Sequence, residues 1–448
     1  MNESPRRLLR RVWESVRQPP SVAASRGADD LIALCDALLS ERGEVSSARI
    51  ASDAIAAYEQ LTEQGRDAFF SKLLDQYAAD PRDVDLAIEA YTAEPSAARL
   101  SALHAAAEPR RQELFRRLNT APGGTRMLVQ MRADLLQTLR AHPDRTAVDN
   151  DLVHLFRAWF NRGFLVLRRI DWSTPANILE KIIHYEAVHE IGDWRDLRSR
   201  IDPPDRRCYA FFHPALVDEP LIFVEVALTR EITDAILPIL AGKREVIPSE
   251  RATTAVFYSI SNCQRGLTGV SFGSFLIKQV AAEISRELPR LSTFVTLSPA
   301  PAFAGWLRRE LKEDPPKAIA ADDRAALAAL ETGEWMNDPD GAERLREPLM
   351  RAAATYFLTA RTRTRAPVDP VARFHLGNGA RLERIDWLAD PSPKGLAQSF
   401  GMMVNYLYDL DDIEKNHEAY AGSRTIVASS AVKKLARPMR ELVPAGES

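Results

Sequence analysis

The sequence predicts an α+β protein in which an all-helical bundle is followed by a mixed α/β domain. Three observations support this. Apolar stripes at helical spacing fill the first part of the chain, strand-like runs are absent there, and short β-type runs alternate with helical segments from about residue 150 onward. We therefore expect two domains, a helical bundle over 1–145 and a mixed α/β domain over 146–448.

The helical elements of the first domain follow from apolar residues that recur at three-and-four spacing. Such a stripe covers one face of a helix, and several stripes are buried together most simply in a bundle. The Ala-Pro-Gly-Gly segment at 121–124 separates two of the helices. The predicted helices are at 31–39, 69–77, 100–118 and 127–139.

The second domain contains short runs rich in β-branched and aromatic residues, which are typical of strands. The predicted strands are at 221–228, 253–261, 294–297, 382–388 and 405–410. The predicted helices between them are at 230–240, 271–288, 323–332, 343–358 and 395–403. The Pro- and Arg-rich stretch 361–370 is expected to be a loop.

Composition excludes several classes of function. The 448 residues carry a net charge of -3, which favours neither a nucleic-acid surface nor an anionic membrane. No stretch approaches the roughly 20 apolar residues that span a bilayer. Cys35, Cys208 and Cys263 lie far apart, so a disulfide framework and a zinc ribbon are both disfavoured. A reducing compartment, the cytoplasm, fits best, and the Arg- and Ala-rich composition suggests a bacterial source.

A glycine-containing turn joins the predicted strand 253–261 to the helix 271–288. Glycines let backbone amides approach a ligand closely, and a helix that begins there adds unpaired N–H groups, so the turn suits a pyrophosphate. An ordinary tight turn is an equally good interpretation of the spacing alone. The candidate coenzyme-A-binding residues are Gln264, Arg265, Gly266, Leu267, Thr268, Gly269 and Val270, among which Arg265 can add a direct charge.

This turn resembles the coenzyme-A pyrophosphate loop of the GNAT acyltransferase fold, although its glycines are three apart, unlike the usual Q/R-x-x-G-x-G/A pattern. The whole segment SISNCQRGLTGVSFGSFLIKQV, followed by TLSPAPAFAGWL, resembles malonyl-CoA decarboxylase. Four further stretches, at 118–136, 158–182, 186–214 and 374–390 continuing into 401–410, support the same family. The resemblance covers roughly residues 100–425, and the first 100 residues match only in helical character.

The resemblance implies a GNAT-like catalytic domain that converts malonyl-CoA to acetyl-CoA and carbon dioxide. It implies Ser298 of the LSP motif and His375 of FHLGNGA as the catalytic pair. It also implies a homo-oligomer, commonly a tetramer, assembled partly through the helical domain. No cofactor or metal is expected, because the thioester itself accepts the electrons. Asn378, Asn405 and Tyr406 are possible supporting groups.

The residues themselves suit this chemistry. Decarboxylation leaves an enolate that needs hydrogen-bond donors and then a proton. An imidazole that titrates near neutrality can donate both, and the serine can hold the carboxylate or orient the imidazole. Without the resemblance, Ser298 would be interpreted as a turn or cap residue before proline, and His375 as a loop histidine.

Other interpretations use the same residues differently. A GNAT-type acyltransferase would need an amine acceptor, and a non-catalytic acyl-CoA-binding regulator would turn nothing over. Ser271 lies in a G-x-S-x-G pattern, but a hydrolase elbow places its serine directly at the strand end, and here 262–268 intervenes. His184 and His189 are not spaced as in HExxH, and the acidic run 409–414 is expected to be a solvated turn or helix start.

Overall fold

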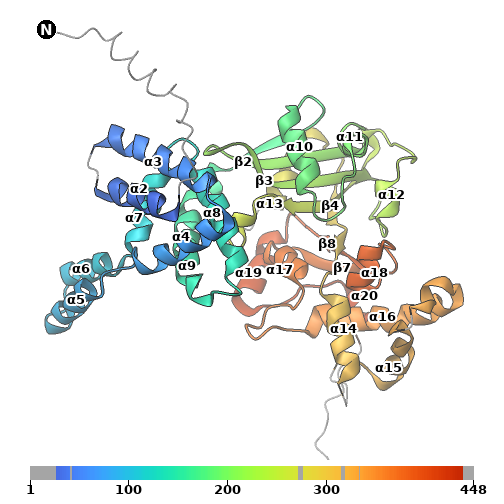
Figure 1. Ribbon diagram of the computed structural model, residues 1–448. Coiled ribbons are helices and arrows are strands. Elements are labelled where there is room, and N and C mark those ends of the chain that lie inside the picture. The colour runs from blue at the N-terminus through green and yellow to red at the C-terminus, as the bar shows by residue number, and fades with distance from the viewer. Residues whose placement is uncertain (1–26, 41–42, 271–275, 314–317, 332, 437–448) are drawn as a thin grey trace, which may run out of the picture. The chain divides into compact units, whose positions relative to one another are not determined.

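The computed structural model describes residues 27–40, 43–270, 276–313, 318–331 and 333–436. The chain divides into two compact units (Figure 1). We call Met1–Phe160 together with Gln264–Val270 the helical unit, and Asn161–Cys263 together with Ser271–Ser448 the sheet unit. The expected order, a helical region followed by a mixed α/β domain, is confirmed.

The helical unit consists of amphipathic helices. They are α2 (Ala28–Ser40), α3 (Glu44–Glu59), α4 (Glu63–Asp75), α5 (Pro81–Ala93), α6 (Ala97–Ala107), α7 (Arg110–Asn119), α8 (Gly124–Thr138) and α9 (Thr146–Trp159). The prediction of one helix over 100–118 is wrong, because two helices occupy this stretch. Glu108 is extended before Pro109, as the residue preceding a proline prefers, so α6 ends there and α7 begins after the proline.

The core of the helical unit is formed by most of these helices but not by all of them. Fully buried apolar side chains come from α2, α3, α4, α7, α8 and α9, among them Leu38, Ala51, Leu73, Phe115, Leu128 and Leu152. By contrast, α5 and α6 pack against each other and bury no residue at all. They form a hairpin (the α5–α6 hairpin) that leaves its apolar side chains accessible.

The sheet unit is built on an eight-stranded sheet of order β1-β2-β3-β4-β5-β8-β6, with β7 paired to β8. The strands are β1 (Val166–Ile170), β2 (Arg206–His213), β3 (Leu216–Thr229), β4 (Thr254–Asn262), β5 (Thr293–Thr296), β6 (Ser298–Pro299), β7 (Arg381–Asp386) and β8 (Met403–Leu407). Among these strands only β4 and β5 pair in parallel. All five predicted strands are present, whereas β1, β2 and β6 were not anticipated.

The sheet unit also contains helices, some of which pack on the sheet and others on neighbouring helices. They are α10 (Ala176–Tyr185), α11 (Trp194–Ile201), α12 (Leu237–Leu240), α13 (Leu276–Glu287), α14 (Phe303–Lys312), α15 (Ala321–Leu327), α16 (Pro339–Thr359), α17 (Pro370–Gly377), α18 (Pro393–Ser399), α19 (Ile413–Ser423) and α20 (Ser430–Leu435). The predicted helix at 230–240 is wrong except for its last turn. The Ile236 amide bonds the carbonyl of Ala389, a tertiary contact rather than a helical one. The predicted start of α13 at 271–275 lies outside the described residues.

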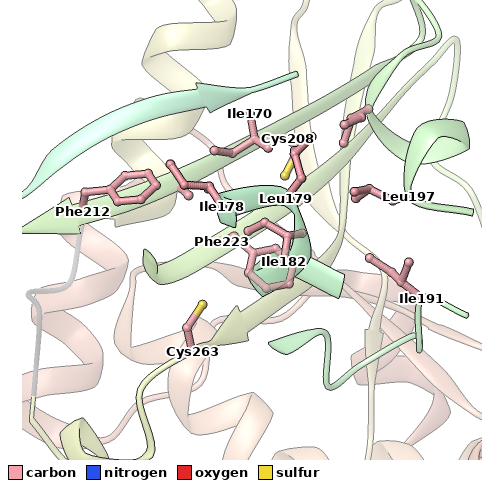
Figure 2. Packing of buried hydrophobic residues seen from close by; sticks show 12 residues of the cluster. Ile170, Ile178, Leu179, Ile182, Ile191, Leu197, Cys208, Phe212, Phe223 and Cys263 are labelled. Carbon is pink, nitrogen blue, oxygen red and sulfur yellow. The ribbon is translucent and has the colours of Figure 1, made fainter. Parts of the chain in front are cut away.

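Two apolar clusters anchor the sheet. Figure 2 shows the first, in which side chains of β1, β2 and β3 pack against α10 and α11. Its members include Ile170, Cys208, Phe212, Phe223, Ile178, Leu179, Ile182 and Leu197. The second cluster joins β3, β4, β5 and β8 to α12. Both clusters bury the central strands against neighbouring elements, so side chains at the strand ends rest on a packed core.

The parallel pair β4 and β5 separates partway along its length. The strands are in register from Thr254 opposite Thr293 to Phe257 opposite Thr296. A last backbone bond joins the Leu297 amide to the carbonyl of Phe257 at 3.0 Å, while β4 continues to Asn262. The chain after β5 instead pairs with β8 through β6.

Within the part of the chain that the structure describes, no helix is both long and apolar enough to cross a bilayer.

Candidate active site

Ser298 lies where the sheet opens. It follows β5 by one residue and forms the two-residue strand β6 with Pro299, opposite Val404 of β8. Its side chain is nearly buried, with an exposed fraction of 5%. Because β8 holds this short strand, the hydroxyl is fixed by the sheet rather than by a free turn.

His375 lies in the last part of α17, not in a loop. Asp369 caps this helix by accepting hydrogen bonds from the amides of Val371 and Ala372. The chain leaves the helix through Gly379, whose φ of +83° favours glycine. A β-carbon there would lie 2.1 Å from the carbonyl oxygen of Ile413, so this sharp exit requires glycine. The helix thereby carries the imidazole inward, with an exposed fraction of 2%.

The two candidate catalytic residues are in hydrogen-bond contact although 77 positions separate them. Ser298 Oγ lies 3.0 Å from His375 Nε2. On the other side of the ring, the Tyr408 hydroxyl lies 2.8 Å from Nδ1. The Ser298 hydroxyl donates to Thr296 Oγ1 at 2.8 Å. An unbroken row of hydrogen bonds therefore runs from Tyr408 through the imidazole and the serine to Thr296.

Burial controls the charge of this imidazole. Desolvation lowers the pKa of His375 to about 3, and no charged group acts against that shift. The sequence-based expectation that it titrates near neutrality is therefore wrong. The ring is neutral over the physiological range, so one nitrogen carries the hydrogen and the other a lone pair.

A cavity of about 220 Å³ opens onto both side chains. Its lining consists of Val188, Phe257, Tyr258, Ile260, Asn262, Ser298, Pro299, Pro370, Val371, Phe374 and His375. Most of these residues are apolar. None of those that line it is Asp, Glu, Lys or Arg. A negatively charged group that entered would therefore lose hydration and meet hydrogen-bond donors but no counter-ion.

The three residues expected to support the pair surround it without lining the cavity. Tyr406 stacks its ring on His375, with centroids 4.6 Å apart and planes 21° from parallel. Asn405 donates to the backbone carbonyl of Thr296 at 2.8 Å. Asn378 ends α17 and donates to the carbonyl of Phe374 at 2.7 Å. Each therefore contacts an element that carries a member of the row.

Thr296 and Tyr408 are the members of this site that the sequence did not predict. Thr296 and Ser298 are two positions apart, as are Tyr406 and Tyr408. In an extended strand that spacing places two side chains on the same face. This alternation is the signal that could have found both residues once Ser298 and Tyr406 had been chosen.

The loop Gln264–Val270 belongs to the helical unit. Gly266 packs so tightly that a β-carbon would lie 1.8 Å from the carbonyl oxygen of Val129 in α8. Arg132 of the same helix donates to the carbonyls of Gly266 and Thr268 at 2.7 and 2.8 Å, and Asp149 pairs with this arginine at 2.7 Å. Gly266 is therefore needed for contact with a helix, in addition to any role near a ligand.

The loop's own amides are partly used. The amides of Leu267, Thr268 and Val270 bond to carbonyls within the loop. The side chain of Arg265 is exposed, and Gly269 adopts a positive φ of +77°. Ser271, the alternative hydrolase nucleophile, lies outside the described residues, as do the amides up to residue 275.

The other polar clusters form no metal site in the described part of the chain. No group of three or more His, Cys, Asp or Glu residues there is arranged to hold an ion. His189 is largely buried, and burial lowers its pKa to about 4. The acidic run is a turn that leads into α19 at Ile413, as expected.

Comparison with known proteins identifies the family. The model of the malonyl-CoA decarboxylase N-terminal domain matches residues 77–160, and that of the C-terminal domain matches residues 163–445. A mitochondrial malonyl-CoA decarboxylase of Anser anser anser is 40% identical over 353 residues, which are 72% of this chain and 69% of the relative.

Solved structures give the same result. The crystal structure of malonyl-CoA decarboxylase from Rhodopseudomonas palustris shares 58% identity with a TM-score of 0.89, and that from Agrobacterium vitis shares 52% with a TM-score of 0.87. In each case the match covers 91% of this chain and 100% of the other. The chain belongs to the malonyl-CoA decarboxylase family.

Proposed function

We propose that this protein converts malonyl-CoA to acetyl-CoA and carbon dioxide, with Ser298 and His375 at the reacting acyl group. The observation that carries the proposal is the contact of these two side chains at 3.0 Å on the wall of an uncharged cavity. Family membership names the substrate, and the cavity supplies groups suited to the reaction.

The reaction breaks one carbon–carbon bond. The malonyl carboxylate leaves as carbon dioxide, and its electron pair forms the enolate of acetyl-CoA. One proton added to the methylene carbon then completes the product. His375 can donate a hydrogen bond to the developing enolate and afterwards give up its proton, because the carbanion is a far stronger base than the imidazolate left behind, which water reprotonates. Ser298, whose oxygen lies 3.0 Å from His375 Nε2, positions that nitrogen beside the acyl group.

The uncharged lining favours bond cleavage. A carboxylate concentrates its charge on two oxygens and depends strongly on water, whereas the transition state spreads that charge into the thioester. No Lys or Arg among the lining residues stabilises the carboxylate in return. The thioester accepts the electrons, so this pathway assigns the chemistry to the substrate and to two neutral side chains.

The coenzyme-A moiety is assigned to the loop Gln264–Val270. The exposed guanidinium of Arg265 suits a phosphate. Gly269 of the same loop is also exposed and has no side chain that would shield its backbone. Arg132 supports the loop from α8 through two carbonyls. In this arrangement the loop contributes to binding of substrate and product alike, and not to the chemical step.

The test is an assay of purified protein with malonyl-CoA alone, in which product masses are measured. We expect acetyl-CoA and carbon dioxide without added ATP or metal. Ser298→Ala and His375→Ala should each lower kcat by about 10²- to 10⁴-fold while the thermal midpoint stays close to that of the parent. Full turnover in both variants would remove the pair from the mechanism.

The same assay separates the alternatives. Free coenzyme A released only when an amine is added would indicate an acyltransferase, and release without amine would indicate a thioesterase. Tight binding with no product would indicate a regulator. Each of these results would contradict the proposed decarboxylation.

We also propose that the protein is a cytoplasmic homo-oligomer, a tetramer as in its family, and that the α5–α6 hairpin takes part in assembly. Helices of this length are marginal in water unless an apolar face is covered, and this hairpin leaves Leu86 at 64% and Leu100 at 46% exposure. Light scattering should show a smaller assembly for Leu86→Arg than for Val45→Arg, which changes an even more exposed apolar side chain on α3, at 86%. Equal masses for both variants would exclude the hairpin.

A further inference from the structure

The row of hydrogen bonds at the candidate active site has a direction. His375 stands between two hydroxyls, with Ser298 Oγ at 3.0 Å from Nε2 and Tyr408 at 2.8 Å from Nδ1. A neutral imidazole has one N–H and one lone pair. One hydroxyl must therefore accept a hydrogen bond from the ring while the other donates to it.

Thr296 determines which hydroxyl accepts from the ring and which donates to it. Ser298 gives its only hydrogen to Thr296 Oγ1 at 2.8 Å, so its oxygen is left to accept. The only donor that the ring can offer it is Nε2–H. The Nδ1 lone pair then takes the hydrogen of Tyr408, so both ring nitrogens and the Ser298 hydroxyl have hydrogen-bond partners.

The threonine is itself held firmly. Its side chain is completely buried at the end of β5, and its hydroxyl oxygen accepts the Tyr406 amide of β8 at 3.2 Å. The Asn405 side chain binds the carbonyl of the same residue at 2.8 Å. These contacts fix the threonine hydroxyl as the point at which the row ends.

We propose that Thr296 is a positioning residue that keeps the active-site proton on Nε2 of His375 and turns the hydrogen of Ser298 away from the ring. The inference rests on the proposed function and deepens it. A serine nucleophile needs the reverse order, with its hydrogen bonded to a ring lone pair that acts as base. Thr296 thus holds the pair as a proton donor for decarboxylation and disfavours attack of the serine on the thioester.

This order of donors and acceptors is kept at physiological pH because the imidazole does not gain a second proton. Burial lowers the pKa of His375 to about 3, and no carboxylate opposes this shift, so the ring stays neutral. The Tyr408 hydroxyl keeps its hydrogen as well, since complete burial raises its pKa well above the usual value. Both groups therefore retain the protonation that the row requires.

The experiment compares Thr296→Val, which keeps the shape but removes the acceptor, with Thr296→Ser, which keeps the acceptor. Long-range proton–nitrogen NMR on protein labelled with ¹⁵N-histidine reports which ring nitrogen carries the hydrogen, and the His375 signals are assigned by their loss in His375→Gln. We expect the Nε2–H form in the parent and in Thr296→Ser, and a gain of the Nδ1–H form in Thr296→Val.

Kinetics provide a second readout. Thr296→Val should lower kcat for decarboxylation roughly 10- to 100-fold with little change in KM, and the ratio of free coenzyme A to acetyl-CoA released should rise. Thr296→Ser should restore kcat and the parental ratio. Equal losses in the two variants would show that side-chain packing, not the acceptor, matters, and would overturn the proposal.

Two further measurements do not depend on the folding of Thr296→Val. The Nδ1–H form in the parent protein would overturn the inference directly. Tyr408→Phe should retain the Nε2–H form, because Ser298 still accepts from it, and loss of that form would assign control to Tyr408 instead. If the parent shows the expected ring form but does not decarboxylate malonyl-CoA, the proposed function fails while the assignment of the proton stands.

Discussion

The candidate catalytic pair and the candidate coenzyme-A loop are held in contrasting ways. Ser298 and His375 are fixed by side chain to side chain hydrogen bonds in a buried row within the sheet unit. The loop around Gly266 is fixed through its backbone, by close packing on α8 and by Arg132 within the helical unit. The candidate catalytic pair therefore depends on where single protons lie, whereas the loop depends only on a stable backbone conformation.

The largest expected effect tests the close packing of the loop. Gly266→Ala places a β-carbon 1.8 Å from the backbone oxygen of Val129, so loop or helix must move. We expect the free energy of unfolding to fall by about 3 kcal/mol. Gly242→Ala, where nothing lies within 4 Å, is the matched control. Equal stability of the two variants in urea denaturation would mean that the loop does not rest on α8.

A smaller effect separates binding from chemistry. Arg132→Met removes both bonds to the loop carbonyls and leaves the packing volume similar. We expect KM for malonyl-CoA to rise about tenfold, equivalent to about 1.4 kcal/mol, with kcat nearly unchanged. Arg126→Met, which changes an exposed arginine of the same helix, should have no effect. A drop in kcat at constant KM would contradict the assignment of binding to the loop and of the chemical step to Ser298 and His375.

The buried imidazole should also make stability depend on pH. Its folded pKa of about 3 lies below the unfolded value, so below about pH 6.5 only the unfolded chain gains the proton. The parent should therefore lose about 1 kcal/mol per pH unit relative to His375→Gln between pH 6 and 4. His104→Gln removes an exposed histidine and should leave the slope of the parent unchanged. A parallel slope for parent and His375→Gln would place the ring in water.

The smallest effect concerns the exposed charge of the loop. Arg265→Ala should raise KM only about threefold, since a solvent-exposed ionic contact contributes little, and the difference should shrink at high salt. Arg290→Ala removes another exposed arginine and should leave KM unchanged. An effect of Arg265→Ala that does not depend on salt would exclude direct contact with a phosphate.

The sequence predicted the two-part architecture and five of the strands, and it failed where tertiary contacts decide. Residues 206–213 form a strand that is buried along its entire length, so they lack the alternation by which half-buried strands are recognised. The segment before Leu237 has helical composition, but the Ile236 amide bonds to a distant carbonyl instead. The local sequence pattern reveals neither the complete burial of a strand nor a hydrogen bond to a distant carbonyl.

The candidate site shows the same limit. The motifs around Ser298 and His375 selected both residues without coordinates, and the structure brings them into contact. Their partners Thr296 and Tyr408 were not selected, because each is recognised only by the atom it faces. The pKa of the imidazole was also predicted wrongly, since burial of a histidine shortly before Gly377 and Gly379 cannot be inferred from its neighbours in sequence.

The assignment of residues 264–270 to the helical unit has a consequence for biosynthesis. The chain emerges from the ribosome with all eight described helices of that unit complete, yet the segment that covers Val129 and Arg132 follows about a hundred residues later. Until then Val129 and Arg132 of the nascent bundle lack their contacts with the loop. A recombinant fragment that ends near residue 160 therefore lacks a segment of its own compact unit.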